Sequence, residues 1–269
     1  DYGSIQYWDL RYTTYVQLSL FRKFRQTIIL LLRTSRDTEP FDWYEKYRGS
    51  DIQILLRKRL KKDKSDVILN IGCGNSRLAE DLTEDGFEKY VFFSSRLIYI
   101  ISTITHTHKK KTFINSVTNI DISSVVIEQM TEKYKSWMPK LRWYTMNTSE
   151  LRFEDAIFDV CLDKATLDSI ICSSSSGSAY DRAFRIHSML QEISRCMKKN
   201  SVYIVISHGS PERRLRLLEK KEYGWTVEVE MIRPDEALGA PEGRMYYVYI
   251  CTKGTRHVVP DTGDYRSLA

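Results

Sequence analysis

The chain has 269 residues, of which 42% are hydrophobic and 28% charged, with only 12 Gly and 6 Pro. This composition allows a sizeable core and excludes wholesale disorder, and the length suits one large α/β domain or two small ones. The longest apolar runs, at 28–32 and 97–101, fall far short of the roughly 18–20 residues that cross a bilayer, so we expect no membrane span.

The net charge of +6 comes from two segments. Residues 13–39 hold five basic and two acidic side chains, and residues 92–116 hold four basic side chains and no acidic one. Neither segment has a clear hydrophobic period, so we interpret both as surface insertions or as non-coding sequence translated within the gene. The rest of the chain is close to neutral, which argues against a nucleic-acid partner; binding through the basic segments stays an alternative.

The five cysteines are widely spaced and form no CxxC or Cys/His ligand pattern. The sequence therefore predicts neither a metal site nor a disulfide framework. Scattered thiols suit a reducing compartment, so we expect a cytoplasmic protein.

Aromatic residues gather ahead of the first expected strand, in YWDLRY (7–12) and FDWY (41–44). Aromatic faces attract a cationic ligand by about 0.5–2 kcal/mol per well-placed contact. Trp8, Tyr12 and Trp43 therefore predict either a lid over such a ligand or a helix that packs its rings against the sheet edge.

From Asp66 onward, short apolar runs alternate with helical stretches, which is typical of βαβ units around a parallel sheet. The expected strands and helices, in chain order, are a strand at 66–74, a helix at 76–87, a strand at 117–123, a helix at 123–137, a strand at 141–146, a strand leading into a helix over 158–170, a helix at 182–198, a strand at 202–207 and a helix at 211–221. Two final strands, at 225–231 and 245–251, are expected to pair as an antiparallel hairpin. A reversed last strand argues against a dinucleotide dehydrogenase, whose sheet ends with parallel strands.

The first expected strand runs into ILNIGCGNS (68–76), where Gly72 and Gly74 let the backbone bend and approach a ligand closely. Arg77 stands where a dinucleotide-binding motif has its third glycine, which disfavours pyrophosphate; a nucleoside without phosphate does not require that close approach. Asp121 ends the next strand, where an acid accepts hydrogen bonds from both ribose hydroxyls. Alone, such an acid is more often a helix cap; after the glycine turn, the ribose interpretation is favoured.

Two further motifs follow strands. In MNTSEL (146–151), the side-chain oxygen of Asn147 is a candidate acceptor for an adenine amino group, with Thr148 beside it; an Asx-turn is the equally weighted alternative. In FDVCLDKATLD (158–168), Asp163 and Lys164 end a central strand, where ligands bind in open α/β sheets.

Together these segments, with YGW (223–225), resemble the family of elongation factor 1-alpha lysine methyltransferases over most of residues 7–231. The resemblance implies a single α/β domain over 1–269 with a Rossmann-like seven-stranded methyltransferase sheet, mostly parallel with a reversed final strand and with helices on both faces. It divides into a lid region at 1–65 that carries the 13–39 insertion, a catalytic core at 66–251 that carries the 92–116 insertion, and a tail at 252–269. Ala165 replaces a family glycine, Asn147 a family aspartate and Asn200-Ser201 a glycine pair.

The resemblance also implies S-adenosyl-L-methionine as cofactor and a protein-lysine N-methyltransferase that acts, as a monomer, on elongation factor 1-alpha. The implied cofactor contacts are Trp8, Tyr12, Trp43, Gly72, Gly74, Asp121, Ile122, Asn147, Thr148 and Lys164. Methyl transfer needs a neutral amine in line with the methyl carbon, and Asp163 is the candidate to orient it; Lys164 is expected to contact the cofactor carboxylate or a backbone carbonyl. The alternatives are a methyltransferase for another protein or a small molecule, and a non-catalytic cofactor-binding scaffold.

Overall fold

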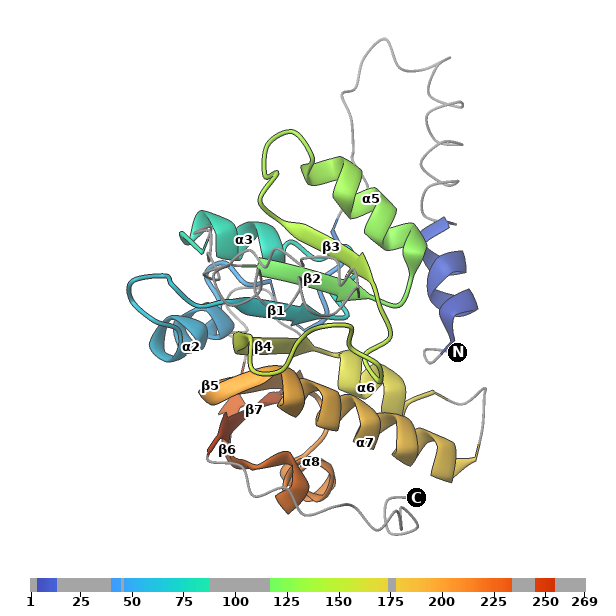
Figure 1. The fold of residues 1–269 in the computed structure, drawn as a ribbon, viewed down its shortest axis with the longest axis vertical. Coiled ribbons are helices and arrows are strands. Elements are labelled where there is room, and N and C mark those ends of the chain that lie inside the picture. The colour runs from blue at the N-terminus through green and yellow to red at the C-terminus, as the bar shows by residue number, and fades with distance from the viewer. Residues whose placement is uncertain are drawn as a thin grey trace, which may run out of the picture.

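A seven-stranded sheet forms the centre of the computed structural model, which describes residues 4–13, 40–44, 46–87, 117–173, 178–233 and 245–254 (Figure 1). The strands are β1 (Ile68–Ile71), β2 (Val117–Asp121), β3 (Arg142–Thr145), β4 (Phe158–Lys164), β5 (Met197–Ser207), β6 (Trp225–Ile232) and β7 (Tyr246–Lys253). They lie in the order β3-β2-β1-β4-β5-β7-β6. β1 to β5 pair in parallel, and β7 runs antiparallel to both of its neighbours, which confirms the mostly parallel sheet with a reversed final strand.

The helices are one over residues 5–13, α2 (Asp51–Arg59), α3 (Leu78–Glu84), α5 (Ser124–Tyr134), α6 (Thr166–Ile171), α7 (Ala179–Cys196) and α8 (Pro211–Leu218), with a 3-10 turn, η1 (Lys221–Tyr223). The sequence analysis did not assign α2, although Ser50 caps it by accepting from the Gln53 N–H. The helix expected from residue 123 is α5, and Ser123 caps it with a hydroxyl that accepts from the Val126 N–H.

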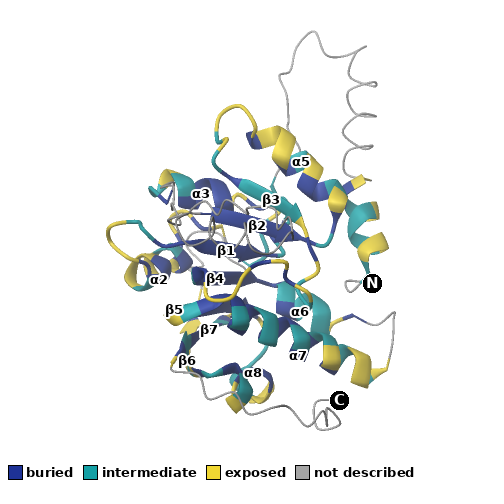
Figure 2. Cartoon of the chain, viewed as in Figure 1, coloured by how far each residue is buried: buried dark blue, intermediate teal, exposed yellow. Residues whose placement is uncertain are grey.

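Two apolar layers cover the sheet, one on each face (Figure 2). One layer packs α2, α3 and α5 against strand residues such as Ile68 and Ile204. The other layer packs α6, α7 and α8 against Leu69 and Tyr203, which adjoin Ile68 and Ile204 in sequence. Alternate residues of one strand point to opposite faces, so the mostly apolar composition of β1 and of residues 202–206 in β5 follows from burial on both sides.

Several boundaries differ from expectation, and two of these differences lengthen strands of the sheet. β5 begins at Met197 instead of residue 202, because α7 ends at Cys196 and the register shifts between the pairs Phe158–Met197 and Val160–Val202. Asn200 lies in this irregular stretch with a φ of 61°, a left-handed angle that asparagine tolerates. β7 extends to Lys253, so residues 252–253 of the expected tail belong to the sheet.

Residues 14–39, residues 92–116 and residues 255–269 lie outside the described part of the chain. The two expected insertions, apart from residue 13, and most of the expected tail therefore stay predictions. Among the helices that are described, none combines the length and apolar character needed to cross a bilayer. Within the same ranges, no three His, Cys, Asp or Glu side chains gather as a metal-binding group.

Ala165, the residue between β4 and α6, has a φ of 77° and a ψ of 0°, which is strained for any residue with a Cβ. We expect Ala165→Gly to raise the free energy of unfolding by about 0.5–1 kcal/mol, because glycine adopts this backbone without that strain. Urea denaturation measures the change. Asn200→Gly is the matched control and should gain less; an Ala165→Gly variant no more stable than the parent would contradict the strain.

Candidate functional site

The turn after β1 is built from glycines that cannot be replaced without a clash. Gly72 has a φ of 59° and Gly74 one of 52°. A Cβ on Gly72 would overlap the Thr166 side chain, and one on Gly74 would come within 2.9 Å of the Tyr12 hydroxyl. Thr166 donates in turn to the Ile71 carbonyl at 2.9 Å, so the turn is pressed between α6 and the N-terminal helix. Both glycines line the cavity described below.

Asp121, at the end of β2, is tied to this turn. Its carboxylate accepts from the Gly74 N–H and from the Ser123 N–H, both at 2.9 Å. The side chain is nearly buried, and this burial raises the pKa of Asp121 above its ordinary value, against the two backbone N–H groups, which favour the charged form. Asp121 therefore presents a positioned acceptor at the carboxyl edge of the sheet.

The third wall follows β3. The Met146 N–H donates to the Asp121 carbonyl at 2.8 Å, which brings the Asn147–Thr148 pair beside β2. The Asn147 Oδ1 accepts from the Ser149 N–H at 3.0 Å, so the Asx-turn is present. Asn147 and Thr148 also line the cavity, and the amide oxygen keeps a second lone pair for a ligand. The two interpretations weighed in the sequence are thus compatible.

The aromatic residues of the two N-terminal segments form one side of the cavity. Trp8 and Tyr12 lie one turn apart on the helix and stack with their ring centroids 6.0 Å apart, and Trp43 meets Phe41 edge to face at 5.1 Å. The helix over residues 5–13 does pack rings toward the sheet, and the same rings line the cavity. Burial raises the pKa of the Tyr12 phenol, which keeps it protonated.

Lys164 lines the cavity, but its ammonium already has a carboxylate partner. Its Nζ lies 2.5 Å from the Asp42 Oδ1, and both side chains are at most 8% exposed. Ser76 donates to the same Asp42 oxygen. The sequence analysis expected Lys164 to meet a cofactor carboxylate or a backbone carbonyl and did not anticipate Asp42, whose position depends on the fold of the 40–44 segment.

Asp163 does not line the cavity, contrary to its expected role toward an amine. Alternation along β4 turns its side chain away from that of Lys164, and it is 1% exposed. The carboxylate accepts from the Thr166 N–H at 2.7 Å, the Leu167 N–H at 3.1 Å and the Tyr203 hydroxyl at 3.0 Å. Asp163 is therefore a positioning residue for the start of α6.

A second carboxylate, Asp168, was quoted within the DKATLD motif but given no role. It accepts from the Arg214 guanidinium at 2.8 Å, the Ser207 hydroxyl at 2.5 Å and the His208 N–H at 3.0 Å, and also from the Tyr44 hydroxyl. Tyr44 has a φ of 68°. This cluster connects the 40–44 segment to β5 and α8, next to the part of α6 that lines the cavity.

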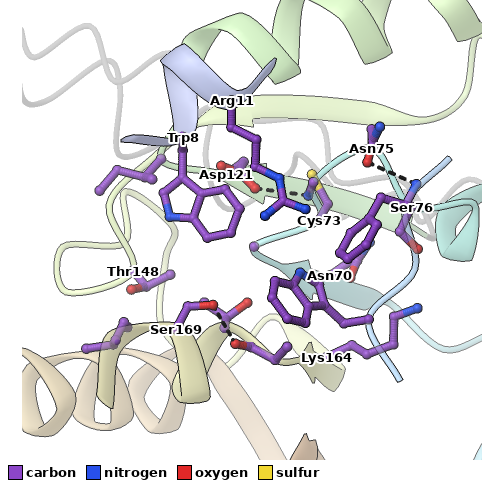
Figure 3. A pocket seen from close by; sticks show the side chains of 18 of the residues that line it. Trp8, Arg11, Asn70, Cys73, Asn75, Ser76, Asp121, Thr148, Lys164 and Ser169 are labelled. Atoms are coloured by element: carbon purple, nitrogen blue, oxygen red, sulfur yellow. Dashed lines mark hydrogen bonds between the residues drawn. The ribbon is translucent and has the colours of Figure 1, made fainter. Parts of the chain in front are cut away.

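All ten residues expected to contact a cofactor line this one cavity, at the carboxyl ends of β1, β2 and β4 (Figure 3). Figure 3 shows Trp8 and Arg11 reaching in from the N-terminal helix, opposite Thr148, Ser169 and Lys164. The wall also contains residues that the sequence analysis missed: Arg11, Phe41, Asn70, Cys73, Asn75, Ser76, Leu78, Ser149, Ala165, Thr166, Ser169, Ile170 and Arg185. Most adjoin a motif residue in sequence, and this adjacency was the available signal.

An open α/β sheet with a reversed last strand, a glycine turn after β1 and an acid at the end of β2 defines a Rossmann-like nucleoside-binding domain of the methyltransferase type. The chain belongs to the methyltransferase-domain family, whose sequence model matches residues 62–238.

Among relatives, EEF1A lysine methyltransferase 4 of Bos taurus is 27% identical over 228 residues, which cover 84% of this chain and 69% of that one. The human eEF1A lysine and N-terminal methyltransferase is 27% identical over 237 residues, 86% of this chain but only 25% of that longer protein. A solved SAM-dependent methyltransferase from Methanosarcina mazei matches with a TM-score of 0.51 and 17% sequence identity. The match covers 80% of this chain and 100% of that one, and it shows that the two folds are similar.

Burial raises the pKa of Asp163 to about 7, the hydrogen bonds to its carboxylate notwithstanding. An acid whose pKa is higher in the folded state binds more protons folded than unfolded, so its contribution to stability falls as the pH rises from about 4 to 7. Asp163→Asn stays neutral at every pH. We therefore expect the free energy of unfolding of this variant, relative to that of the parent, to rise by about 1–3 kcal/mol when the pH is raised from 5 to 8. Urea denaturation at both pH values measures this; a difference that does not change with pH would contradict it.

Proposed function

We propose that the chain is an S-adenosyl-L-methionine-dependent protein-lysine N-methyltransferase that acts on elongation factor 1-alpha. The observation that carries this proposal is the single cavity in which the glycine turn, Asp121, the Asn147–Thr148 pair and the aromatic side converge. The names of the curated relatives support the substrate, since they describe lysine methyltransferases of that factor.

The residues present fit the cofactor. Asp121 offers a carboxylate to the two ribose hydroxyls, and Asn147 with Thr148 offers acceptors and donors at the adenine end. Trp8 and Tyr12 supply aromatic faces that favour a positively charged sulfur. When bound, the cofactor supplies an electrophilic methyl group on a sulfonium centre.

The chain must supply a desolvated, aligned acceptor amine. Free lysine has a pKa near 10.4, so removing its proton at a pH of about 7.4 costs roughly 4 kcal/mol. Ser169 and Ile170 of α6 line the cavity, and Asp168 of the same helix accepts from the Tyr44 hydroxyl. We assign this side of the cavity to the incoming lysine chain. Burial raises the pKa of the Tyr44 phenol, so the hydroxyl stays protonated and donates to Asp168.

The remaining expectations extend the proposal. We place the protein in the cytoplasm, supported by five cysteines that are all free thiols. We propose that it acts as a monomer without a nucleic-acid partner.

Transfer of a tritiated methyl group from the cofactor to purified elongation factor 1-alpha tests the proposed reaction. We expect label on the factor and none on RNA of equal mass, and mass spectrometry should place the methyl groups on lysine. Label on RNA alone would contradict the substrate class. No label on any acceptor, together with measurable cofactor binding, would favour the non-catalytic scaffold.

Replacing Asp121 tests the cofactor contact. We expect Asp121→Ala to weaken binding of S-adenosylhomocysteine at least about tenfold, because the ribose hydroxyls lose a charged acceptor for their hydrogen bonds. Calorimetry measures affinity, and circular dichroism below the unfolding transition checks that the fold is retained, since the Gly74 and Ser123 N–H groups lose a partner too. An unchanged affinity would remove the ribose assignment.

A further inference from the structure

Arg11 places a cation in the cavity wall with no carboxylate bonded to it among the residues that the structure describes. Its guanidinium carbon lies 4.6 Å from the Phe41 ring centroid, 5.5 Å from that of Trp8 and 5.7 Å from that of Trp43. Within the described part of the chain, its hydrogen bond is a long one, 3.4 Å, to the Tyr7 hydroxyl. The guanidinium is thus held by aromatic faces, and its N–H donors are left largely unused.

The wall contains two other cations, Lys164 and Arg185. Lys164 is bonded to Asp42, as described above. Arg185 belongs to α7 and lies on the side of the Asn147–Thr148 pair, where its backbone carbonyl accepts from the Ser149 hydroxyl at 3.2 Å. Arg11 is therefore the cation at the glycine-turn end whose charge the described residues do not neutralise.

Contacts within the chain fix which end of the cavity Arg11 occupies. Phe41, its nearest ring, donates its N–H to the Asn75 Oδ1 at 3.2 Å, directly after the glycine turn. Figure 3 shows the Arg11 side chain extending toward this turn and Asp121, on the far side of Trp8 from Thr148. A nucleoside with its ribose at Asp121 and its adenine at Thr148 directs its amino-acid part toward Arg11.

We propose that Arg11 is the counter-ion for the carboxylate of the bound cofactor and selects adenosyl ligands that carry one. This inference rests on the proposed cofactor and does not depend on the methyl acceptor. A guanidinium offers paired N–H donors that match a carboxylate, and charge-assisted bonds of this kind are the stronger hydrogen bonds in proteins. The three rings lie against the guanidinium and help to hold it in place.

The test compares two ligands that differ only in the carboxylate: S-adenosylmethionine and its decarboxylated form, which keeps the sulfonium and the amine. We expect Arg11→Met to weaken binding of S-adenosylmethionine by about 10- to 100-fold. The decarboxylated ligand should bind the variant as well as it binds the parent, or better, because a repulsion between cations is removed. Calorimetry on the whole chain gives both affinities without any need for turnover.

Two further variants serve as controls. Arg11→Lys keeps the charge on a flexible stem, so it should retain part of the preference for the carboxylate and guards against an Arg11→Met protein that does not fold. Arg185→Gln removes the cation at the other end and should change both affinities by the same factor.

Four results would overturn the proposal. Equal weakening of both ligands by Arg11→Met would mean that Arg11 only holds the aromatic segments together. Unchanged binding of S-adenosylmethionine would remove any role in binding, and a carboxylate-specific loss in Arg185→Gln would place the counter-ion there. Failure of the parent chain to bind either ligand would overturn the cofactor assignment as well, and this outcome is distinct from the first three comparisons.

Discussion

The bond from the Gly74 N–H to the Asp121 carboxylate is the constraint on which the site depends. β1 and β2 are adjacent and parallel, so their carboxyl ends meet at one edge of the sheet, and the Cys73 N–H donates to the Ile120 carbonyl just beyond the paired residues. The glycine turn bends back over this edge, and Asp121 holds it there. A buried carboxylate without these N–H donors would be costly, so the turn and the acid require each other.

The aromatic side of the cavity is attached to the sheet through polar bonds. The Asp9 carboxylate accepts from the Ser123 hydroxyl, the cap of α5, at 2.5 Å. In the 40–44 segment, Asp42 binds Lys164 and Tyr44 binds Asp168. The aromatic rings form the surface toward the cavity. The carboxylate contacts in the helix over residues 5–13 and in the 40–44 segment fix where these rings lie. The arrangement also leaves the Arg11 guanidinium, in the same helix as Asp9, facing the cavity.

The sequence was sufficient to predict the topology, because each βαβ unit shows a short apolar run followed by a helical stretch. The expected hairpin of β6 and β7 identified the reversed strand. It was sufficient to predict that the candidate cofactor contacts lie together, because Gly72 follows β1 and Asp121 ends the adjacent parallel strand β2. It was insufficient for Asp163, whose direction depends on the alternation of β4. Asp42 was missed because its partner, Lys164, lies more than a hundred residues away and no local pattern links them.

A structure of the chain with S-adenosylhomocysteine bound tests the central claim most directly, because it locates the nucleoside relative to the β1–β2 edge. Our account predicts both ribose hydroxyls within hydrogen-bonding distance of the Asp121 carboxylate, with the base beside Asn147 and the Trp8 ring over the ligand. A nucleoside bound elsewhere, or one whose ribose points away from that carboxylate, would contradict it.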